Sequence, residues 1–155
     1  MFKLKHRQRD KPLVLFVSKK SHIKKFATGI TKTRDILIKL FLPGPLTIIL
    51  KAQKKWLLSK DLNISIRIPE YPFLIELIDT FNKPIATTSA NLSGKKPAIR
   101  YDELSLNADL GIRNDRVCKG TVSTIIDAST YPFILKRKGP ISVFTIERYI
   151  PVRIR

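Results

Sequence analysis

The chain alternates short apolar runs of strand length with segments in which apolar residues recur at helical spacing. Apolar stretches of four to eight residues, bounded by turn residues, are typical of buried strands. The runs that predict strands are Leu13–Ser18, Leu46–Ala52, Ile64–Ile68, Pro84–Thr88, Thr121–Asp127 and Phe133–Lys136. Within Ile64–Ile68 the three isoleucines share one face, and Ser65 and Arg67 share the other.

The segments between these runs have the spacing of amphipathic helices. The expected helices are His22–Ala27 (capped by Ser21 and stopped by Gly29), Thr33–Phe41, Tyr71–Phe81, Tyr101–Leu106 and Val143–Ile150. In the third, Pro72 suits the first turn, and the apolar stripe is Phe73, Leu74, Leu77, Ile78 and Phe81. The alternation predicts an α/β fold, a single domain over residues 1–155 with a twisted mixed sheet and flanking helices.

The charge is strongly positive and unevenly distributed. The chain has 30 Lys and Arg against 12 Asp and Glu, a net charge of +18, and residues 1–60 hold 16 of the basic residues with two acids. Such a basic half favours a polyanionic partner, or is a solvated lysine-rich surface with no specific partner. No apolar run approaches the ~18 residues of a membrane span, and no secretion signal is evident. We therefore expect a cytoplasmic protein without a membrane partner.

Several familiar kinds of site are excluded. The single cysteine, Cys118, rules out an internal disulfide and a multi-cysteine zinc site. The two histidines, His6 and His22, lie near one end of the chain and give no basis for a Ser-His-Asp arrangement. The scattered acids do not indicate a carboxylate cage for a metal.

Polar residues at strand ends are the informative ones. Arg67, the Thr87-Thr88-Ser89 string and the Ser123-Thr124 pair interrupt or end predicted strands. In open α/β sheets ligands lie beyond strand ends, and hydroxyls with arginine forks suit phosphate and carboxylate. The alternatives are a surface ion pair for Arg67 and local turn chemistry for Ser89 and Asn91.

Six strings in order resemble the YrdC-type family. They are KHRQRDKPL (5–13), FLPGPLTIIL (41–50), ISIRIPEYP (64–72), PIATTSANLSG (84–94), STIID (123–127) and LKRKGPIS (135–142). The resemblance implies a nucleotidyltransferase, L-threonylcarbamoyladenylate synthase. That enzyme makes threonylcarbamoyl-AMP and pyrophosphate from L-threonine, bicarbonate and ATP, for modification of tRNA position 37.

The resemblance also implies roles for individual residues on a basic concave surface. The residues implied for ATP are Lys5, Arg7, Lys11, Asn63, Ser89 and Arg137. Those implied for threonine are Arg67, Thr87, Asn91 and Ser123. Mg²⁺ is expected on the phosphates rather than on protein ligands. The implied partners are tRNA or double-stranded RNA and the machinery that transfers the threonylcarbamoyl group.

This sequence departs from the family pattern in three places. Members normally have a TDTVYGL-like segment before the Lys-x-Arg string, where this chain begins, and longer members have a C-terminal domain. Some members have a histidine after the Pro-Leu strand, where Phe16 stands here. For a complete chain we expect an exposed hydrophobic sheet edge or face. A non-catalytic RNA-binding module and an inactive truncated remnant remain the alternatives.

Overall fold

The chain divides into two compact units. The computed structural model describes residues 1–6, 8, 12–54, 62–117 and 120–154. The first unit joins Met1–Lys11 to Thr88–Thr121, and the second joins Pro12–Thr87 to Val122–Arg155. Among the described residues, all the strands lie in the second unit, and the first unit has loops and two short 3₁₀ helices, η1 (Tyr101–Glu103) and η2 (Asp115–Val117). The single domain expected over residues 1–155 stays a prediction.

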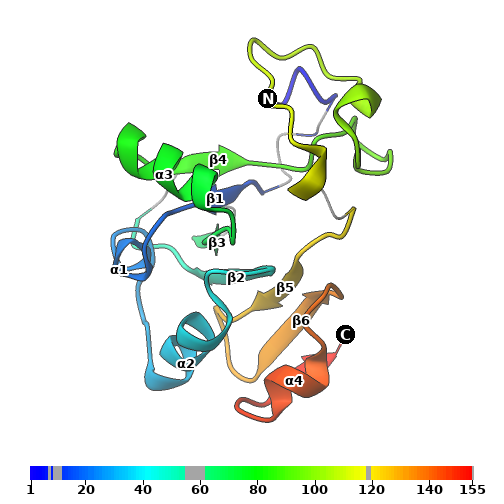
Figure 1. Cartoon of the computed structure of the whole chain (residues 1–155). Helices are drawn as coiled ribbons and strands as arrows, with labels where there is room; N and C mark the ends of the chain where they lie inside the picture. The colour runs from blue at the N-terminus through cyan, green and yellow to red at the C-terminus, as the bar shows by residue number, and fades with distance from the viewer. Residues whose placement is uncertain (7, 9–11, 55–61, 118–119, 155) are drawn as a thin grey trace. The chain divides into compact units, whose positions relative to one another are not determined.

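The second unit is built on one mixed sheet of seven strands. Their bounds are β1 Val14–Phe16, β2 Leu46–Lys51, β3 Asn63–Arg67, β4 Ile85–Thr87, β5 Thr124–Asp127, β6 Phe133–Arg137 and β7 Val152–Ile154. The order across the sheet is β4-β1-β3-β2-β5-β6-β7. Figure 1 shows this order from β4 to β6. Three neighbouring pairs are parallel (β1/β3, β2/β5, β6/β7) and three are antiparallel (β1/β4, β2/β3, β5/β6). The predicted α/β fold with a mixed sheet is confirmed.

Helices complete the core of this unit. They are α1 (Lys20–Ile23), α2 (Lys32–Phe41), α3 (Pro72–Phe81) and α4 (Val143–Glu147). Ile23, Leu37 and Ile146, from α1, α2 and α4, join the strand residues Ile48 and Ile66 in one buried cluster. Each such side chain contributes about 1.5–3 kcal/mol of transfer free energy, so these helices are held mainly by packing against the sheet.

Some expected elements differ from those observed. Ser21 lies inside α1 rather than capping it, because the helix begins after Lys19 and ends at Ile23. The helix expected over 101–106 is only the 3₁₀ turn η1. Strand β7 was not expected, because three residues carry too little periodicity to stand out from a loop.

Helix α3 has the expected length, but its apolar stripe is only partly buried. Ile78 is 3% exposed, whereas Phe73, Leu77 and Phe81 are 45%, 39% and 57% exposed. Helical spacing shows which side chains share a face, but it does not show what covers that face. The stripe therefore predicts the helix correctly, but it does not predict how far each of its side chains is buried.

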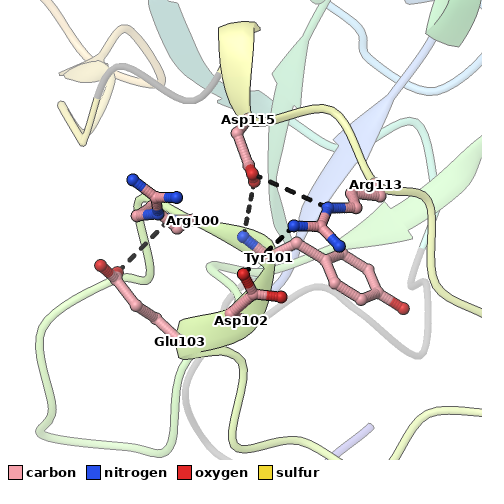
Figure 2. A network of polar contacts seen from close by, with 6 residues as sticks. All are labelled: Arg100, Tyr101, Asp102, Glu103, Arg113 and Asp115. Atoms are coloured by element: carbon pink, nitrogen blue, oxygen red, sulfur yellow. Dashed lines mark hydrogen bonds and ion pairs between the residues drawn. The ribbon is translucent and has the colours of Figure 1, made fainter.

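In the first unit, a polar network joins residues 99–103 to residues 113–115. The Tyr101 amide donates to Asp115 Oδ1 at 2.6 Å, and Arg113 pairs with Asp102 at 3.2 Å. The Arg113 guanidinium also lies 5.8 Å from the centre of the Tyr101 ring. Figure 2 shows these side chains converging on η1. Because the unit contains no sheet among its described residues, such contacts hold its loops in place.

Candidate functional site

The strand register brings several of the implied residues to one end of the neighbouring strands β1, β3, β2 and β5. We call this end of the strands the arginine edge. Arg67 ends β3 and pairs with Phe16 at the end of the parallel strand β1. Strand β2 runs antiparallel to β3 and therefore begins at this edge, where the Gly44 amide donates to the Ile68 carbonyl at 3.0 Å. Thr124, the first residue of β5, pairs with Leu46, so Ser123 reaches the same edge. Ligands of α/β sheets commonly lie at such strand ends.

The Arg67 guanidinium is fixed from two sides. Its Nε donates to the Gly44 carbonyl at 2.9 Å, and its carbon lies 5.7 Å from the centre of the Phe16 ring. A cation over an aromatic face is attracted by the ring quadrupole. These contacts engage Nε and one face of the group, so the terminal nitrogens are the atoms placed to meet an anion.

A second arginine lies in a hydroxyl cluster. Arg137 donates from Nε to the Ser123 carbonyl and from Nη2 to Ser123 Oγ, both at 2.9 Å. Ser123 Oγ is in turn 2.8 Å from Thr47 Oγ1. Thr47 and Ser123 are 1% and 6% exposed, so burial and mutual bonding hold both hydroxyls in place.

The positive charge of Arg137 acts on the guanidinium of Arg67. Burial lowers the pKa of Arg67, and the neighbouring positive charge of Arg137 lowers it further, against an opposing effect of Glu70. Burial also lowers the pKa of Arg137. Both groups remain charged at neutral pH. A bound anion would relieve this repulsion, so the cluster favours a phosphate or carboxylate ligand.

The strand-to-loop segment after β6 packs closely against Ser123 and Thr124. A Cβ placed on Gly139 would lie 2.3 Å from the Thr124 backbone nitrogen. Thr124 Oγ1 donates to the Ile141 carbonyl at 2.9 Å and accepts from the Ile141 amide at 3.0 Å. The glycine thus permits a backbone approach that keeps Arg137 beside Ser123.

In the first unit, the structure brings together Lys5, Ser89 and Asn91. Lys5 is 2% exposed. Its ammonium donates to the backbone carbonyls of Ser89 and Asn91, and lies 3.5 Å from Asn91 Oδ1. The Asn91 amide nitrogen donates to the carbonyls of Leu92 and Lys95 at 2.9 and 2.6 Å. These contacts cross-link the segment from Ser89 to Lys95 within the first unit.

The other implied residues are placed differently. Thr87 donates its hydroxyl to the Val14 carbonyl at 3.0 Å, so this group bonds the adjacent strand. Asn63 begins β3 and Arg67 ends it, which separates them by about 13 Å at ~3.3 Å per residue. The structure therefore does not bring Asn63 to the arginine edge. Arg7 and Lys11 lie outside the described residues.

The sequence patterns do not predict that Gly44, Thr47 and Phe16 support the site. Thr47 could have been found as the one polar residue within the apolar run Leu46–Leu50. Gly44 acts through its carbonyl, which no residue-type argument reveals. Phe16 was noted only as a departure from the family, yet it contacts the face of Arg67.

The described residues do not offer a protein-held metal site. They contain no group of three or more His, Cys, Asp or Glu side chains placed to hold a metal ion. The arginine edge holds the two guanidinium cations of Arg67 and Arg137, whose positive charges disfavour a divalent cation beside them. In the part of the chain that the structure describes, no helix is long and apolar enough to cross a membrane.

Comparison with known proteins decides the family. Residues 1–139 match the Sua5/YciO/YrdC family, which is described as "Telomere recombination". The chain belongs to the Sua5/YciO/YrdC family. Over 154 residues it is 36% identical to a Methanocaldococcus jannaschii protein, covering 96% of this chain and 72% of that protein.

Two further relatives have the name threonylcarbamoyl-AMP synthase. A threonylcarbamoyl-AMP synthase of Pyrococcus abyssi is 29% identical over 161 residues, covering 97% of this chain and 46% of the relative. A mouse protein of the same name is 31% identical over 144 residues, covering 83% of this chain and 50% of the relative. The chain thus spans about half the length of these two relatives.

Solved structures agree with this family assignment. The structure of P. abyssi Sua5 complexed with L-threonine has a TM-score of 0.85 and 27% identity, covering 98% of this chain and 48% of that one. Escherichia coli YciO is 19% identical and has a TM-score of 0.72. The match covers 94% of this chain and 74% of the YciO chain. At that identity the likeness to YciO supports the fold alone.

Proposed function

We propose that this chain forms threonylcarbamoyl-AMP and pyrophosphate from L-threonine, bicarbonate and ATP. The product would serve threonylcarbamoyl modification of tRNA, as part of a cytoplasmic pathway. The observation that carries the proposal is the likeness to P. abyssi Sua5, a protein solved with L-threonine, over 98% of this chain. Relatives named threonylcarbamoyl-AMP synthase, in P. abyssi and in mouse, also support it.

The charges at the arginine edge suit these substrates. ATP carries about four negative charges and threonine one carboxylate, and phosphoryl transfer depends on positioning and charge stabilisation more than on a strong protein base. We assign Arg67 to the threonine carboxylate, because a guanidinium held through Nε can still present its terminal nitrogens as a fork. Phe16 fixes the plane of that fork.

Arg137 and Ser123 are assigned to the nucleotide side of the site. Two hydrogen bonds to one residue fix the direction of the Arg137 guanidinium. Thr47 restrains the Ser123 hydroxyl from the other side. Such prior ordering removes part of the entropy cost of binding a flexible triphosphate. Any Mg²⁺ would arrive on the ATP phosphates, since the described residues offer no cage for it.

The reaction has two chemical steps. The threonine amine attacks the carbon of bicarbonate, and a carbamate forms with loss of water; attack on CO2 gives the same carbamate with loss of a proton instead. A carbamate oxygen then attacks the α-phosphorus of ATP, the bond to the bridging oxygen breaks, and pyrophosphate leaves with the electron pair. The chain's residues hold the two anions in reach of each other, which supplies the proximity term of catalysis.

The direct test is product analysis. Purified chain is incubated with ATP, Mg²⁺, L-threonine and bicarbonate, and threonylcarbamoyl-AMP is sought by mass spectrometry. Product that requires both threonine and bicarbonate supports the proposal. No product from a sample whose circular dichroism shows the folded sheet contradicts it for this chain.

Matched variants test the residue assignments. We expect Arg67→Ala to raise the KM for threonine about 10- to 100-fold, because a charged hydrogen-bonded contact contributes about 1.5–3 kcal/mol. Arg153→Ala is the control, since that arginine is exposed on the edge strand β7. An unchanged threonine KM in Arg67→Ala removes Arg67 from the site.

A second candidate function rests on the charge distribution. Residues 1–60 hold 16 Lys and Arg against two acids, which suits a non-catalytic module that binds RNA. That function predicts affinity that falls steeply with salt and does not depend on threonine. Titration of a fluorescent tRNA at 50 and 200 mM salt, with and without ATP and threonine, separates the two candidates.

A further inference from the structure

We propose that Ser18 and Asp79 are positioning residues for Arg67. Their hydrogen bond holds the Arg67 guanidinium, with the Phe16 ring against it, in place for the carboxylate of an amino-acid substrate. The inference rests on the proposed function, in which Arg67 binds the threonine carboxylate. All four residues belong to the second unit.

The first argument is a hydrogen bond between the segment after β1 and helix α3. The Ser18 hydroxyl donates to Asp79 Oδ1 at 2.5 Å, and Lys19 pairs with the other oxygen of that carboxylate at 3.1 Å. Ser18 and the preceding Val17 are both buried. A hydrogen bond to a charged acceptor is short and roughly twice as strong as a neutral one. This bond therefore fixes residues 17–18 against α3.

The second argument is the path from this bond to Arg67. The Val17 amide, one residue before Ser18, donates to the Arg67 carbonyl at 3.1 Å. One residue earlier, Phe16 pairs with Arg67 in the strand register, and its ring centre lies 5.7 Å from the guanidinium carbon. Residues 16–18 therefore contact Arg67 at one end and α3 at the other.

These contacts close a loop through the main chain. From Arg67 the chain passes through residues 68–71 to α3, which begins at Pro72 and carries Asp79. The Ser18 hydroxyl and the Val17 amide then connect Asp79 back to the Arg67 carbonyl. Removal of the hydroxyl opens this loop, and the backbone on both sides of Arg67 regains conformational freedom.

The cluster contains the three residue types of a hydrolase triad, but their arrangement does not suit one. His22 Nδ1 lies 3.4 Å from the Ser18 hydroxyl, beyond the ~2.6–3.2 Å that joins a nucleophile to its base. The hydroxyl donates to Asp79 instead, whereas the carboxylate of a triad bonds the histidine. Ser18 is therefore a structural donor and not a nucleophile.

Loss of the Ser18 bond should affect the threonine side of the site alone. Arg137 is held separately, because it bonds Ser123, which Thr47 restrains. If Arg67 has its binding orientation in only a fraction of molecules, the apparent dissociation constant for threonine rises by the inverse of that fraction. We expect Ser18→Ala to raise the KM for threonine about threefold to 10-fold and to leave kcat and the KM for ATP within about twofold.

The experiment observes the two arginines directly. Heteronuclear NMR of the full chain without substrate follows the Nε–H signals of Arg67 and Arg137, which both donate to backbone carbonyls. We expect Ser18→Ala to speed solvent exchange of the Arg67 signal at least about 10-fold and to leave the Arg137 signal unchanged. Ser21→Ala, at an exposed position of α1, is the matched control and should change neither. Wild-type exchange at Arg67 in Ser18→Ala overturns the proposal.

Two variants of Asp79 separate positioning from a general loss of stability. Asp79→Ala removes the acceptor of the Ser18 hydroxyl and should speed exchange at Arg67 as Ser18→Ala does. Asp79→Asn removes the charge but keeps an acceptor oxygen, so exchange at Arg67 should stay within about twofold of wild type. Equal exchange in the two variants overturns the proposal.

A double variant tests whether the two side chains act as a pair. Exchange at Arg67 in Ser18→Ala with Asp79→Ala should be no faster than in either single variant, because both changes break the same bond. Effects that multiply overturn the pairing. If Ser18→Ala does not fold, Asp79→Ala decides alone, since Asp79 is only partly buried.

Failure of the proposed function can be distinguished from failure of this inference. If wild-type chain makes no threonylcarbamoyl-AMP, the proposed function fails, and the NMR signals still decide whether Ser18 positions Arg67. If wild-type chain makes product and Ser18→Ala speeds exchange at Arg67 without raising the KM for threonine, the proposed function stands and the positioning role is overturned.

Discussion

Arg137 makes two hydrogen bonds to the single residue Ser123, one to its carbonyl oxygen and one to its hydroxyl, both 2.9 Å long. The pair joins the end of β6 to the residue just before β5, two strands that are neighbours in the sheet. Because one of the two acceptors is a backbone atom, substitution of Ser123 removes only one of the two hydrogen bonds. The two bonds can therefore be tested separately.

Ser123→Ala and Arg137→Lys should weaken ATP binding to different extents. Ser123→Ala removes the hydroxyl acceptor and leaves the carbonyl bond, so we expect affinity to fall about threefold to 10-fold. Arg137→Lys loses the planar fork and both bonds, and we expect about 10- to 100-fold. Isothermal titration of ATP measures both, with exposed Lys138→Met as the control. If the two variants lost equal ATP affinity, the guanidinium of Arg137 would contribute nothing beyond its bond to the Ser123 hydroxyl.

Gly139→Ala should destabilise the second unit through a steric clash. The new Cβ would lie 2.3 Å from the Thr124 nitrogen and 2.6 Å from the Ser123 carbonyl carbon, and neither backbone atom can move without disturbing β5. Overpacking of this kind costs about 1–3 kcal/mol. Urea unfolding gives the free energy directly.

Gly29→Ala is the matched control for that clash. Gly29 has a φ of +66°, and no atom lies within 4 Å of the place that an alanine Cβ would take. We therefore expect this substitution to lower the free energy of unfolding by about 1 kcal/mol through backbone strain alone. If Gly139→Ala is no more destabilising than Gly29→Ala, the close approach of the Gly139 backbone does not hold in solution.

The strands could be predicted from the sequence because each is a short apolar run with clear boundaries. Ile64, Ile66 and Ile68 alternate with Ser65 and Arg67, and the three isoleucines do lie in the core. The order of the strands could not be predicted, because apolar runs do not specify which neighbour they pair with. The parallel pairing of β6 with β7 depends on a chain end that showed no periodicity.

The sequence predicts which residues belong to the candidate site, but it predicts only part of their arrangement in space. Arg67, Ser123 and Arg137 were found from strand ends and from the family strings, and the register brings them to one edge. The support from Gly44 comes from a backbone carbonyl, which residue identity does not reveal. The burial of Lys5 was also unpredictable, because a lysine in a basic segment is usually solvated.

Two adjacent residues of α3 should differ sharply in their effect on stability. Ile78 is 3% exposed and Leu77 is 39% exposed. We expect Ile78→Ala to lower the free energy of unfolding by about 2–4 kcal/mol, since it leaves a cavity, and Leu77→Ala by under about 1 kcal/mol. Urea titration of both variants measures the difference. A loss of equal size in Leu77→Ala would mean that the exposed side of α3 is covered in solution.

Asp79 should make the stability of the second unit fall in acid. Its pKa lies below the ordinary value because the Ser18 hydroxyl and then Lys19 bond the carboxylate, at 2.5 and 3.1 Å. A depressed folded pKa contributes stability that is fully present above the unfolded pKa of about 3.9 and is lost as the pH falls through the folded value.

Thermal unfolding of wild type and Asp79→Asn from pH 3 to pH 7 tests this sign. We expect wild type to have the higher Tm from pH 7 down to about pH 5, and the gap to close below about pH 4, where the carboxyl becomes protonated. A gap for Asp79→Asn that widens toward low pH would show that the carboxylate is destabilised in the folded chain, contrary to its contacts with Ser18 and Lys19.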